Sequence, residues 1–229
     1  FSHTGSDSRY FNREGRYGDG GAYRDPNSPY RCWYDFDPKY KGGYRSWWGF
    51  ETLPEVNEET PSYVEFITGE GGVIDTWLRR GAAGFRLDVA DELPDEFIEK
   101  IRTAVKRVGP EKFLLGEVWE DATTKYGFSQ RRTYLLGKGL DSVMNYPFKN
   151  AVLDFVKGKP AEQAMGEILS ICEHYPAPAM DTALNFLSTH DTERALTVIA
   201  DEPANGRGRE WQSGRCVTGE AYEEGMLRL

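Results

Sequence analysis

Apolar and polar residues follow helical and strand periods along most of the chain after residue 57. The clearest helix is predicted over residues 94–108, where apolar residues recur three and four positions apart with Glu and Lys between them. Four short apolar stretches predict strands: "GFRLD" (84–88), "KFLLGEVW" (112–119), "DSVMNY" (141–146) and "TALNFLS" (182–188). Other helices are predicted over residues 61–80 with a glycine interruption, near Tyr134, over 161–172 and from Thr192.

The first 57 residues show neither period and differ in composition from the rest. They hold 14 of the 31 aromatic residues, together with many Gly, Asp, Asn and Pro. Disordered segments are poor in Trp and Tyr, so this stretch is predicted to be an ordered, irregular loop or small subdomain. We expect most of its aromatic side chains to pack the loop onto its scaffold, while exposed ones offer platforms for flat apolar surfaces.

The alternation of strands and helices predicts an α/β body over residues 58–229. Parallel strands joined by right-handed helical crossovers fit both a doubly wound sheet and a (β/α)8 barrel. Three predicted strands end in charged residues: Asp88, Glu117 and the pair His190-Asp191. Because the carboxyl ends of barrel strands meet at one mouth, this pattern favours a partial (β/α)8 TIM barrel.

Some of these charged residues also have simpler explanations. Asp88 and Arg86 lie two positions apart on a strand, where they share a face and can form an ion pair. Asp191 can cap the helix that follows it, and His190 can be a satisfied histidine at a strand end. Glu117 is harder to explain in this way, because apolar residues follow it and no basic residue is adjacent. The coincidence of all of them at strand ends favours a common site.

Charge and hydropathy restrict the partners of the chain. A net charge of −9, with Lys and Arg scattered among acidic residues, argues against a nucleic-acid surface. No stretch approaches the roughly 18 apolar residues of a membrane span. The chain begins with Phe1 rather than methionine, so we expect it to be part of a longer protein. The sequence assigns no cellular compartment.

Carboxylates around one mouth suggest glycoside hydrolysis. Cleaving an acetal needs one carboxylic acid to protonate the leaving oxygen and one carboxylate to capture the oxocarbenium-like carbon. Arg86 is expected to favour the charged form of Asp88, whereas Glu117 lies near Trp119 and has no cation beside it in the sequence. Asp88 is therefore the candidate nucleophile, and Glu117 is the candidate acid and subsequent base.

Several motifs carry a family resemblance. "GFRLDVA", "GEVWE" and "FLSTHD" resemble, in order and spacing, three signature segments of the α-amylase family, glycoside hydrolase family 13. The opening "FSH" resembles the end of a further signature, with Ser2 where asparagine is usual. "LPEVN", at residues 53–57, is most similar to the additional motif of the neopullulanase, cyclomaltodextrinase and amylopullulanase subgroup.

The resemblance implies roles for seven residues. Asp88 would be the nucleophile, Glu117 the general acid and base, and Asp191 a third carboxylate that binds sugar hydroxyls. The other four would bind substrate, around the cleaved sugar or on the leaving-group side: His3, Arg86, His190 and Trp119. The implied chemistry needs no cofactor, and the sequence assigns no ligands for a structural calcium ion. Glu120 stands where neopullulanases often have histidine.

The implied protein is a retaining hydrolase of α-1,4 links, with α-1,6 links as a further target, in α-glucan oligosaccharides: maltodextrins, pullulan or cyclodextrins. Two alternatives stay open: a transglycosylase with the same machinery, and a non-catalytic carbohydrate-binding fragment. By this resemblance the chain supplies the end of barrel strand three, residues 1–57 as an inserted domain after it, and strands four to seven. Because unpaired strand edges invite pairing, we expect self-association or a complementary chain segment.

Overall fold

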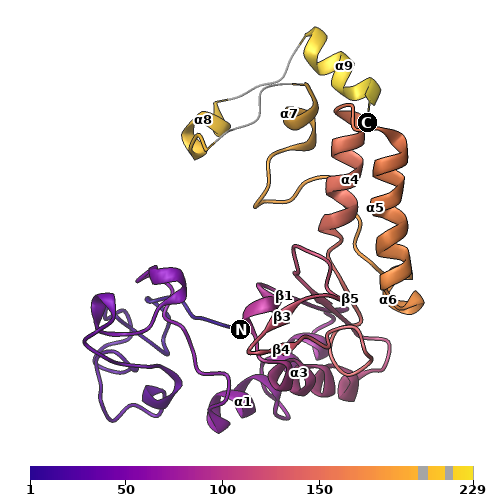
Figure 1. Cartoon of the computed structure of the whole chain (residues 1–229). Coiled ribbons are helices and arrows are strands. Elements are labelled where there is room, and N and C mark those ends of the chain that lie inside the picture. Colours follow the sequence, from indigo (N-terminus) through magenta and orange to yellow (C-terminus); the bar gives the residue numbers. More distant parts are fainter. Residues whose placement is uncertain (201–205, 215–218, 229) are drawn as a thin grey trace. The chain divides into compact units, whose positions relative to one another are not determined.

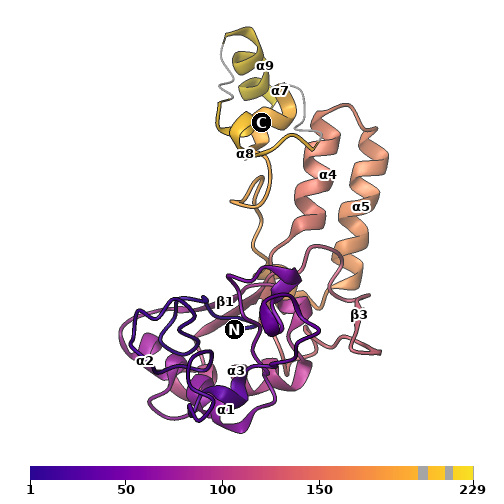
Figure 2. The same ribbon diagram turned by 90° about the vertical axis from the view of Figure 1, so that its left-hand side faces the viewer.

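The computed structural model describes residues 1–200, 206–214 and 219–228, and it divides into two units. The first comprises Phe1–Glu117 and Tyr126–Asp141, and the second comprises Val118–Lys125 and Ser142–Leu229. Figure 1 labels elements of both units, and Figure 2 labels α2. The predicted domain boundary at residue 57 lies inside the first unit and stays a prediction. Each unit is described by itself.

Three α-helices build the apolar base of the first unit: α1 (Pro61–Thr68), α2 (Val73–Arg79) and α3 (Asp95–Val108). They pack against one another in all three pairings. The buried stripe of α3 contains the residues that gave the helical period in the sequence: Phe97, Ile98, Ile101, Ala104 and Val105. Acidic residues in its first turn and basic residues in its last turn complement the helix dipole. These helices confirm the predictions for residues 61–80 and 94–108.

Helix α3 connects two parallel strands, β1 (Gly84–Leu87) and β2 (Phe113–Gly116). The register pairs Gly84 with Phe113 and Leu87 with Gly116. A Cβ at Gly84 would lie 2.0 Å from the carbonyl oxygen of Phe113, so only glycine permits this close approach. The two strands confirm the sequence predictions and set the residues that follow them side by side.

The aromatic segment at the N-terminus is ordered by its own side chains. Its local elements are short 3-10 helices: η1 (Arg31–Trp33), η2 (Lys41–Gly43) and η3 (Trp47–Gly49). Phe11 and Tyr44 are fully buried, with ring centroids 4.6 Å apart. Isolated bridges tie the segment together, among them His3 with Glu55. The expectation of an ordered, irregular segment packed by aromatic residues is confirmed.

The helix predicted near Tyr134 is wrong. A short hairpin of β3 (Tyr126–Gly127) and β4 (Gln130–Arg131) precedes turns in this region. The buried Arg132 guanidinium pairs with Asp95 at 2.8 Å and donates to the carbonyl oxygens of Asp91 and Leu93 at 2.7 and 2.6 Å. These hydrogen bonds satisfy backbone carbonyl groups of the loop that contains η4 (Ala90–Glu92). They outweigh the local helical preference of the segment near Tyr134.

Asp141 joins α3 to β2 through three hydrogen bonds. It accepts from Lys106 Nζ at 2.8 Å, from Arg102 Nη1 at 2.7 Å and from the backbone N–H of Leu114 at 2.8 Å. Burial alone would raise the pKa of the Asp141 carboxyl, but these bonds outweigh burial and lower it. Its stabilising contribution is therefore present at neutral pH and is lost as the pH falls through the folded-state pKa.

We expect Asp141→Asn to lower the free energy of unfolding of the first unit by about 2–3 kcal/mol, because charge-assisted bonds are lost. The matched control is Asp154→Asn, whose partner Lys159 lies 3.2 Å away on an exposed surface. That change should cost less than about 1 kcal/mol. Urea unfolding at pH 7 and at about pH 3, below the ordinary Asp pKa of about 3.9, measures both effects, and the Asp141 effect should be smaller at the lower pH. Equal midpoints for both variants would contradict the structural role of Asp141.

The second unit is largely helical. After β5 (Ser142–Val143), helices α4 (Tyr146–Val156) and α5 (Ala161–His174) lie side by side (Figure 1; Figure 2). Asn145 caps α4 by accepting a hydrogen bond from the backbone N–H of Phe148 at 3.2 Å. Helix α5 confirms its prediction, whereas α4 was not predicted. The remaining helices are α6 (Ala177–Asp181), α7 (Ala195–Ala200), α8 (Arg209–Ser213) and α9 (Glu220–Arg228).

The strand predicted over residues 182–188 is wrong. Within the described residues it forms one parallel bridge, between Leu184 and Met144. The backbone N–H of Leu184 donates to Val143 O at 3.1 Å, and its carbonyl oxygen accepts from Asn145 at 2.9 Å. Because β5 is two residues long and α4 begins at Tyr146, the neighbouring segment offers no longer edge to pair with.

Candidate active site

The ends of β1 and β2 bring together three of the charged residues that the sequence singled out. Asp88 directly follows β1, Glu117 directly follows β2, and the last residues of the two strands are register partners. Arg86 Nη1 donates a hydrogen bond to Asp88 Oδ1, and Arg86 Nη2 lies 3.1 Å from Glu117 Oε2. One guanidinium therefore contacts both carboxylates.

Val89 turns the chain sharply after Asp88 and helps to hold Glu117. Its backbone is left-handed, with φ +43° and ψ 52°, which is strained by about 1–3 kcal/mol in a β-branched residue. This turn points its N–H at Glu117 Oε2, at 2.8 Å. The Glu117 side chain is 5% exposed, whereas that of Asp88 is 51% exposed. The two carboxyl groups thus occupy different environments within one cluster.

Glu117 has a cation beside it in the fold that is not adjacent to it in the sequence. The sequence places no basic residue next to Glu117, but the parallel register brings Arg86 from the neighbouring strand. The sequence pairs Arg86 with Asp88, because the two share a strand face, and the family resemblance also gives it a sugar-binding role. In the structure Arg86 forms ion pairs with both Asp88 and Glu117.

His3 belongs to the same unit. Its Nδ1 lies 2.9 Å from Ser2 Oγ, and its ring centroid lies 5.3 Å from that of Trp47. Burial lowers the pKa of His3, and the negative charges of Asp88 and Glu92 oppose that shift. The imidazole therefore lies within the electrostatic reach of the candidate nucleophile.

The other predicted site residues belong to the second unit. Trp119 stacks on Tyr146, with centroids 4.4 Å apart and planes at 14°. His190 Nε2 lies 3.1 Å from Asp191 Oδ2. Helix α7 begins at Ala195, so the suggestion that Asp191 caps a helix starting at Thr192 is wrong. Whether Asp191, His190 and Trp119 share a site with Asp88 stays a prediction.

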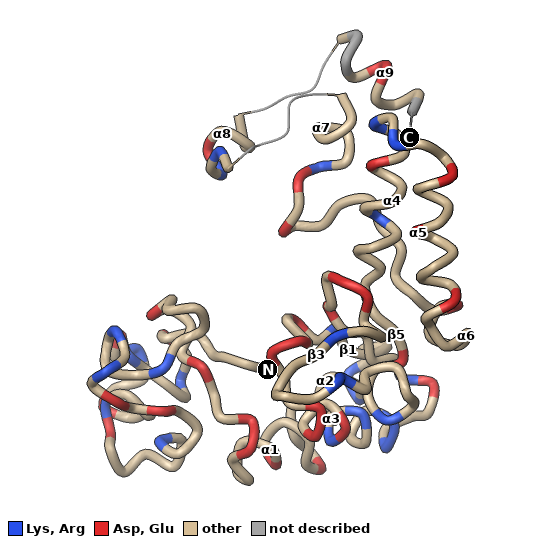
Figure 3. The backbone as a smooth tube through the Cα atoms, viewed as in Figure 1, with Lys and Arg blue, Asp and Glu red and all other residues tan. Residues whose placement is uncertain are grey.

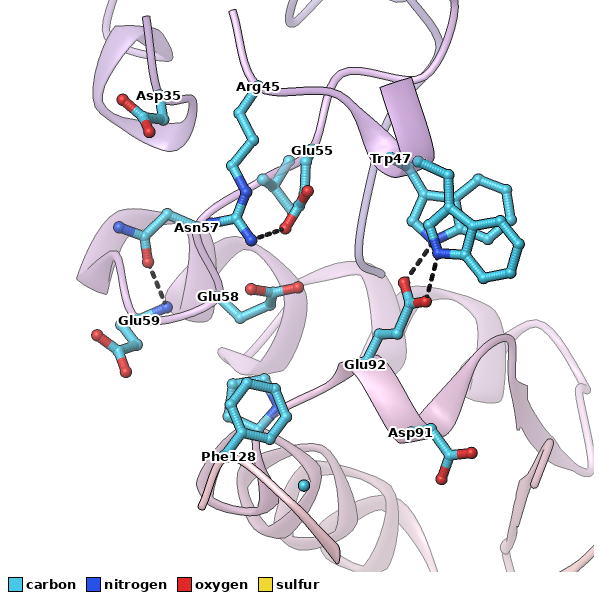
Figure 4. A pocket seen from close by; sticks show the side chains of 14 residues that line it. Asp35, Arg45, Trp47, Glu55, Asn57, Glu58, Glu59, Asp91, Glu92 and Phe128 are labelled. Atoms are coloured by element: carbon cyan, nitrogen blue, oxygen red, sulfur yellow. Dashed lines mark hydrogen bonds and ion pairs between the residues drawn. The ribbon is translucent and has the colours of Figure 1, made fainter. Parts of the chain in front are cut away.

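A pocket of about 710 Å³ in the first unit contains residues that sequence reasoning missed (Figure 4). Two of the residues that line it, Asp91 and Glu92, follow Asp88 closely in the sequence. Burial raises the pKa of its Glu58 to about 7, so near neutral pH that carboxyl group can both donate and accept hydrogen bonds. Acidic and basic residues are interspersed along the chain as a whole (Figure 3). The pocket wall differs, since it combines one arginine, Arg45, with six carboxylates: Asp35, Glu55, Glu58, Glu59, Asp91 and Glu92.

The described residues offer neither a metal cluster nor a membrane-crossing helix. No group of three or more His, Cys, Asp and Glu among them is arranged to hold a metal ion. Likewise, in the described part of the chain no helix combines the length and the apolar character needed to span a bilayer.

Known proteins match most of the chain. The sequence profile described as "Alpha amylase, catalytic domain" matches residues 1–212. An amylopullulanase from Thermoanaerobacterium saccharolyticum is 34% identical and aligns with 90% of this chain and 18% of its own length. A cyclomaltodextrinase from Bacillus sp is 37% identical and aligns with 65% of this chain and 25% of its own length.

Solved structures of proteins with related names are similar to this chain in fold. The type III pullulan hydrolase from Thermococcus kodakarensis superposes with a TM-score of 0.75 at 25% identity, over 99% of this chain and 36% of that chain. A cyclic α-maltosyl-(1→6)-maltose hydrolase from Arthrobacter globiformis, in complex with that sugar, gives 0.74 at 25% identity, over 87% and 42%. The chain spans less than half the length of these relatives. It belongs to the α-amylase catalytic-domain family, whose fold is a (β/α)8 barrel.

Proposed function

We propose that this chain forms part of a retaining α-glucan hydrolase, with β1 and β2 as barrel strands four and five. The observation that carries the proposal is the single guanidinium of Arg86 in contact with both Asp88 and Glu117. Retaining glycosidases hold their two carboxyl groups about 5–5.5 Å apart, whereas inverting ones leave about 6.5–9.5 Å for a water molecule. A shared guanidinium keeps the pair close together, which favours the retaining arrangement.

In the first step, an oxygen of Asp88 bonds to the anomeric carbon while the bond from that carbon to the leaving oxygen breaks. Glu117 gives its proton to that oxygen, and a glycosyl ester on Asp88 results. In the second step, Glu117 takes a proton from water as the water oxygen attacks the anomeric carbon and frees Asp88. The contacts from Arg86 and Val89 both fall on Glu117 Oε2.

The remaining residues bind the sugar in this proposal. His3 lies in the first unit, as the pair does, and Asp191, His190 and Trp119 are contributed by the second unit in the complete barrel. Similar proteins are named for action on pullulan, cyclomaltodextrins and a cyclic maltosyl-maltose. We infer that the substrate of this chain is an α-glucan oligosaccharide of the same kind. In this proposal the chain hydrolyses α-1,4 links, with α-1,6 links as a further target.

The test uses a protein that carries this chain within a complete barrel. Maltotriose, pullulan and β-cyclodextrin are supplied, and proton NMR follows the anomeric signal of the first product formed. Retention predicts that the α-anomer appears first and mutarotates later. A β-anomer formed first would contradict the assignment of Asp88 as nucleophile. With maltotriose as the substrate, products longer than maltotriose would show that the protein also transfers glucosyl units to sugar hydroxyls.

A further inference from the structure

Trp48 is held in an unusual state for a large apolar side chain. It is 73% exposed, and its backbone is left-handed, with φ +51° and ψ 25°. Positive φ is uncommon outside glycine and is kept where the surroundings enforce it, often at ligand clamps. An exposed indole on a strained turn contributes little burial to the fold, so its position calls for another explanation.

The orientation of Trp48 is fixed by its neighbours. Its ring stacks on Trp47, with centroids 5.0 Å apart and planes at 17°. One carboxylate anchors both indoles: Glu92 Oε1 accepts from Trp48 Nε1 at 2.7 Å, and Oε2 accepts from Trp47 Nε1 at 2.5 Å. Figure 4 shows Glu92 pointing at the stacked rings from the pocket wall. Trp47 also contacts His3, so the platform is continuous with the candidate active site.

The charges that line the pocket beside this platform restrict the ligands that it can bind. Six carboxylates and one arginine line it, which disfavours phosphorylated or otherwise anionic ligands. Carboxylates accept strong hydrogen bonds from hydroxyl groups, and an aromatic ring covers the apolar face of a sugar. A volume of about 710 Å³ falls in the usual range for ligand pockets, about 300–1,000 Å³. These features suit a neutral polyhydroxyl ring.

We propose that Trp48, stacked on Trp47 and oriented by Glu92, is a binding platform for a glucosyl ring of the α-glucan in this pocket. The inference rests on the proposed function and adds a specificity-determining residue to it. Glu92 acts here as a positioning residue, because it holds the indoles. A glucan occupying the site at Asp88 would extend along Trp47 to this platform.

The direct test observes the indole N–H signals of the six tryptophans by NMR while maltoheptaose is added to the chain. The signals of Trp47 and Trp48 should shift. The signal of Trp77 should not, because this exposed residue of α2 lines a different pocket. The glucosamine trimer, a cationic sugar, serves as the alternative probe. A response to that probe and none to maltoheptaose would overturn the proposal.

Substitutions give the size of the effect. Trp48→Gly removes the ring and suits the left-handed backbone, so the turn should keep its shape. We expect it to raise the dissociation constant of maltoheptaose by roughly 5- to 10-fold, on the scale of a lost aromatic contact. Glu92→Leu should raise it as well and should move the indole signal of Trp48 in the absence of sugar. Trp77→Ala is the matched control and should change affinity less than about twofold.

The outcomes separate this inference from the proposed function. If Trp48→Gly binds maltoheptaose as tightly as the unmodified chain, the platform is wrong. The retaining hydrolase would still stand in that case, provided that the complete barrel forms the α-anomer first. If sugar shifts the indole signals but the complete barrel cleaves no α-glucan, the platform stands as a binding site and the hydrolase proposal fails.

Discussion

Asp88→Asn is expected to lower the turnover of maltodextrins by roughly 10⁴- to 10⁶-fold in a complete barrel, the scale seen for catalytic groups that act as a unit. An amide oxygen is a poor nucleophile, so the glycosyl ester does not form. The amide can still accept a hydrogen bond from Arg86, so the cluster should keep its geometry. Steady-state kinetics with maltotriose measure the loss.

A matched control for this variant is Glu111→Gln, which changes an exposed carboxylate that follows α3. Its turnover should stay within about twofold of the parent, on the scale expected for surface changes. If Asp88→Asn also turned over maltotriose at near-normal rates, Asp88 could not be the nucleophile. Circular dichroism of both variants would show that the fold is intact.

Glu117→Gln is expected to produce a loss that depends on the leaving group. Maltodextrins need a proton on the departing oxygen and should lose roughly 10²- to 10⁴-fold in the first step. An α-maltosyl fluoride needs no such proton, so its first step should lose far less. The Gln side chain can still accept a hydrogen bond from the Val89 N–H, which keeps the turn in place. Pre-steady-state release of fluoride and of maltose compares the two, and equal losses would contradict the acid role.

The sequence predicted α3, β1 and β2, which position the site, because the pattern of each element is contained in neighbouring residues. Helix α3 has a strong apolar period, β2 is a continuous apolar run, β1 is apolar apart from Arg86, and a charged residue directly follows each strand. Asp88 and Glu117 stood out because each charge directly follows such a run. A parallel βαβ unit then sets both residues at the same edge, which needs no knowledge of distant contacts.

Helix α4 could not be found by periodicity. Its buried residues are Tyr146, Ala151 and Leu153, whose spacings of five and two do not match a helical stripe. The opposite error occurred near Tyr134, where a helical pattern gave way to the buried Arg132 and its carbonyl partners. In both places tertiary packing, rather than local preference, decided the structure.

Partners distant in sequence account for the missed parts of the site. Arg86 reaches Glu117 through strand register, and Glu92 reaches Trp48 across 44 positions. Neither pairing leaves a signal in neighbouring residues. The left-handed turn at Val89 also escaped prediction, because a β-branched residue gives no warning of positive φ. Only Gly, Asn or Asp would have suggested it.

The most direct test of the central claim is to trap the covalent intermediate. In a Glu117→Gln complete barrel, an oxygen of Asp88 should bond to the anomeric carbon of α-maltosyl fluoride and displace fluoride ion into solvent, while the missing base slows hydrolysis of the resulting ester. Mass spectrometry of the digested protein should then find a maltosyl group on the peptide that contains Asp88. A label on any other residue, or fluoride release without a labelled peptide, would contradict the claim that Asp88 is the nucleophile and Glu117 the acid and base at the same glucosyl carbon.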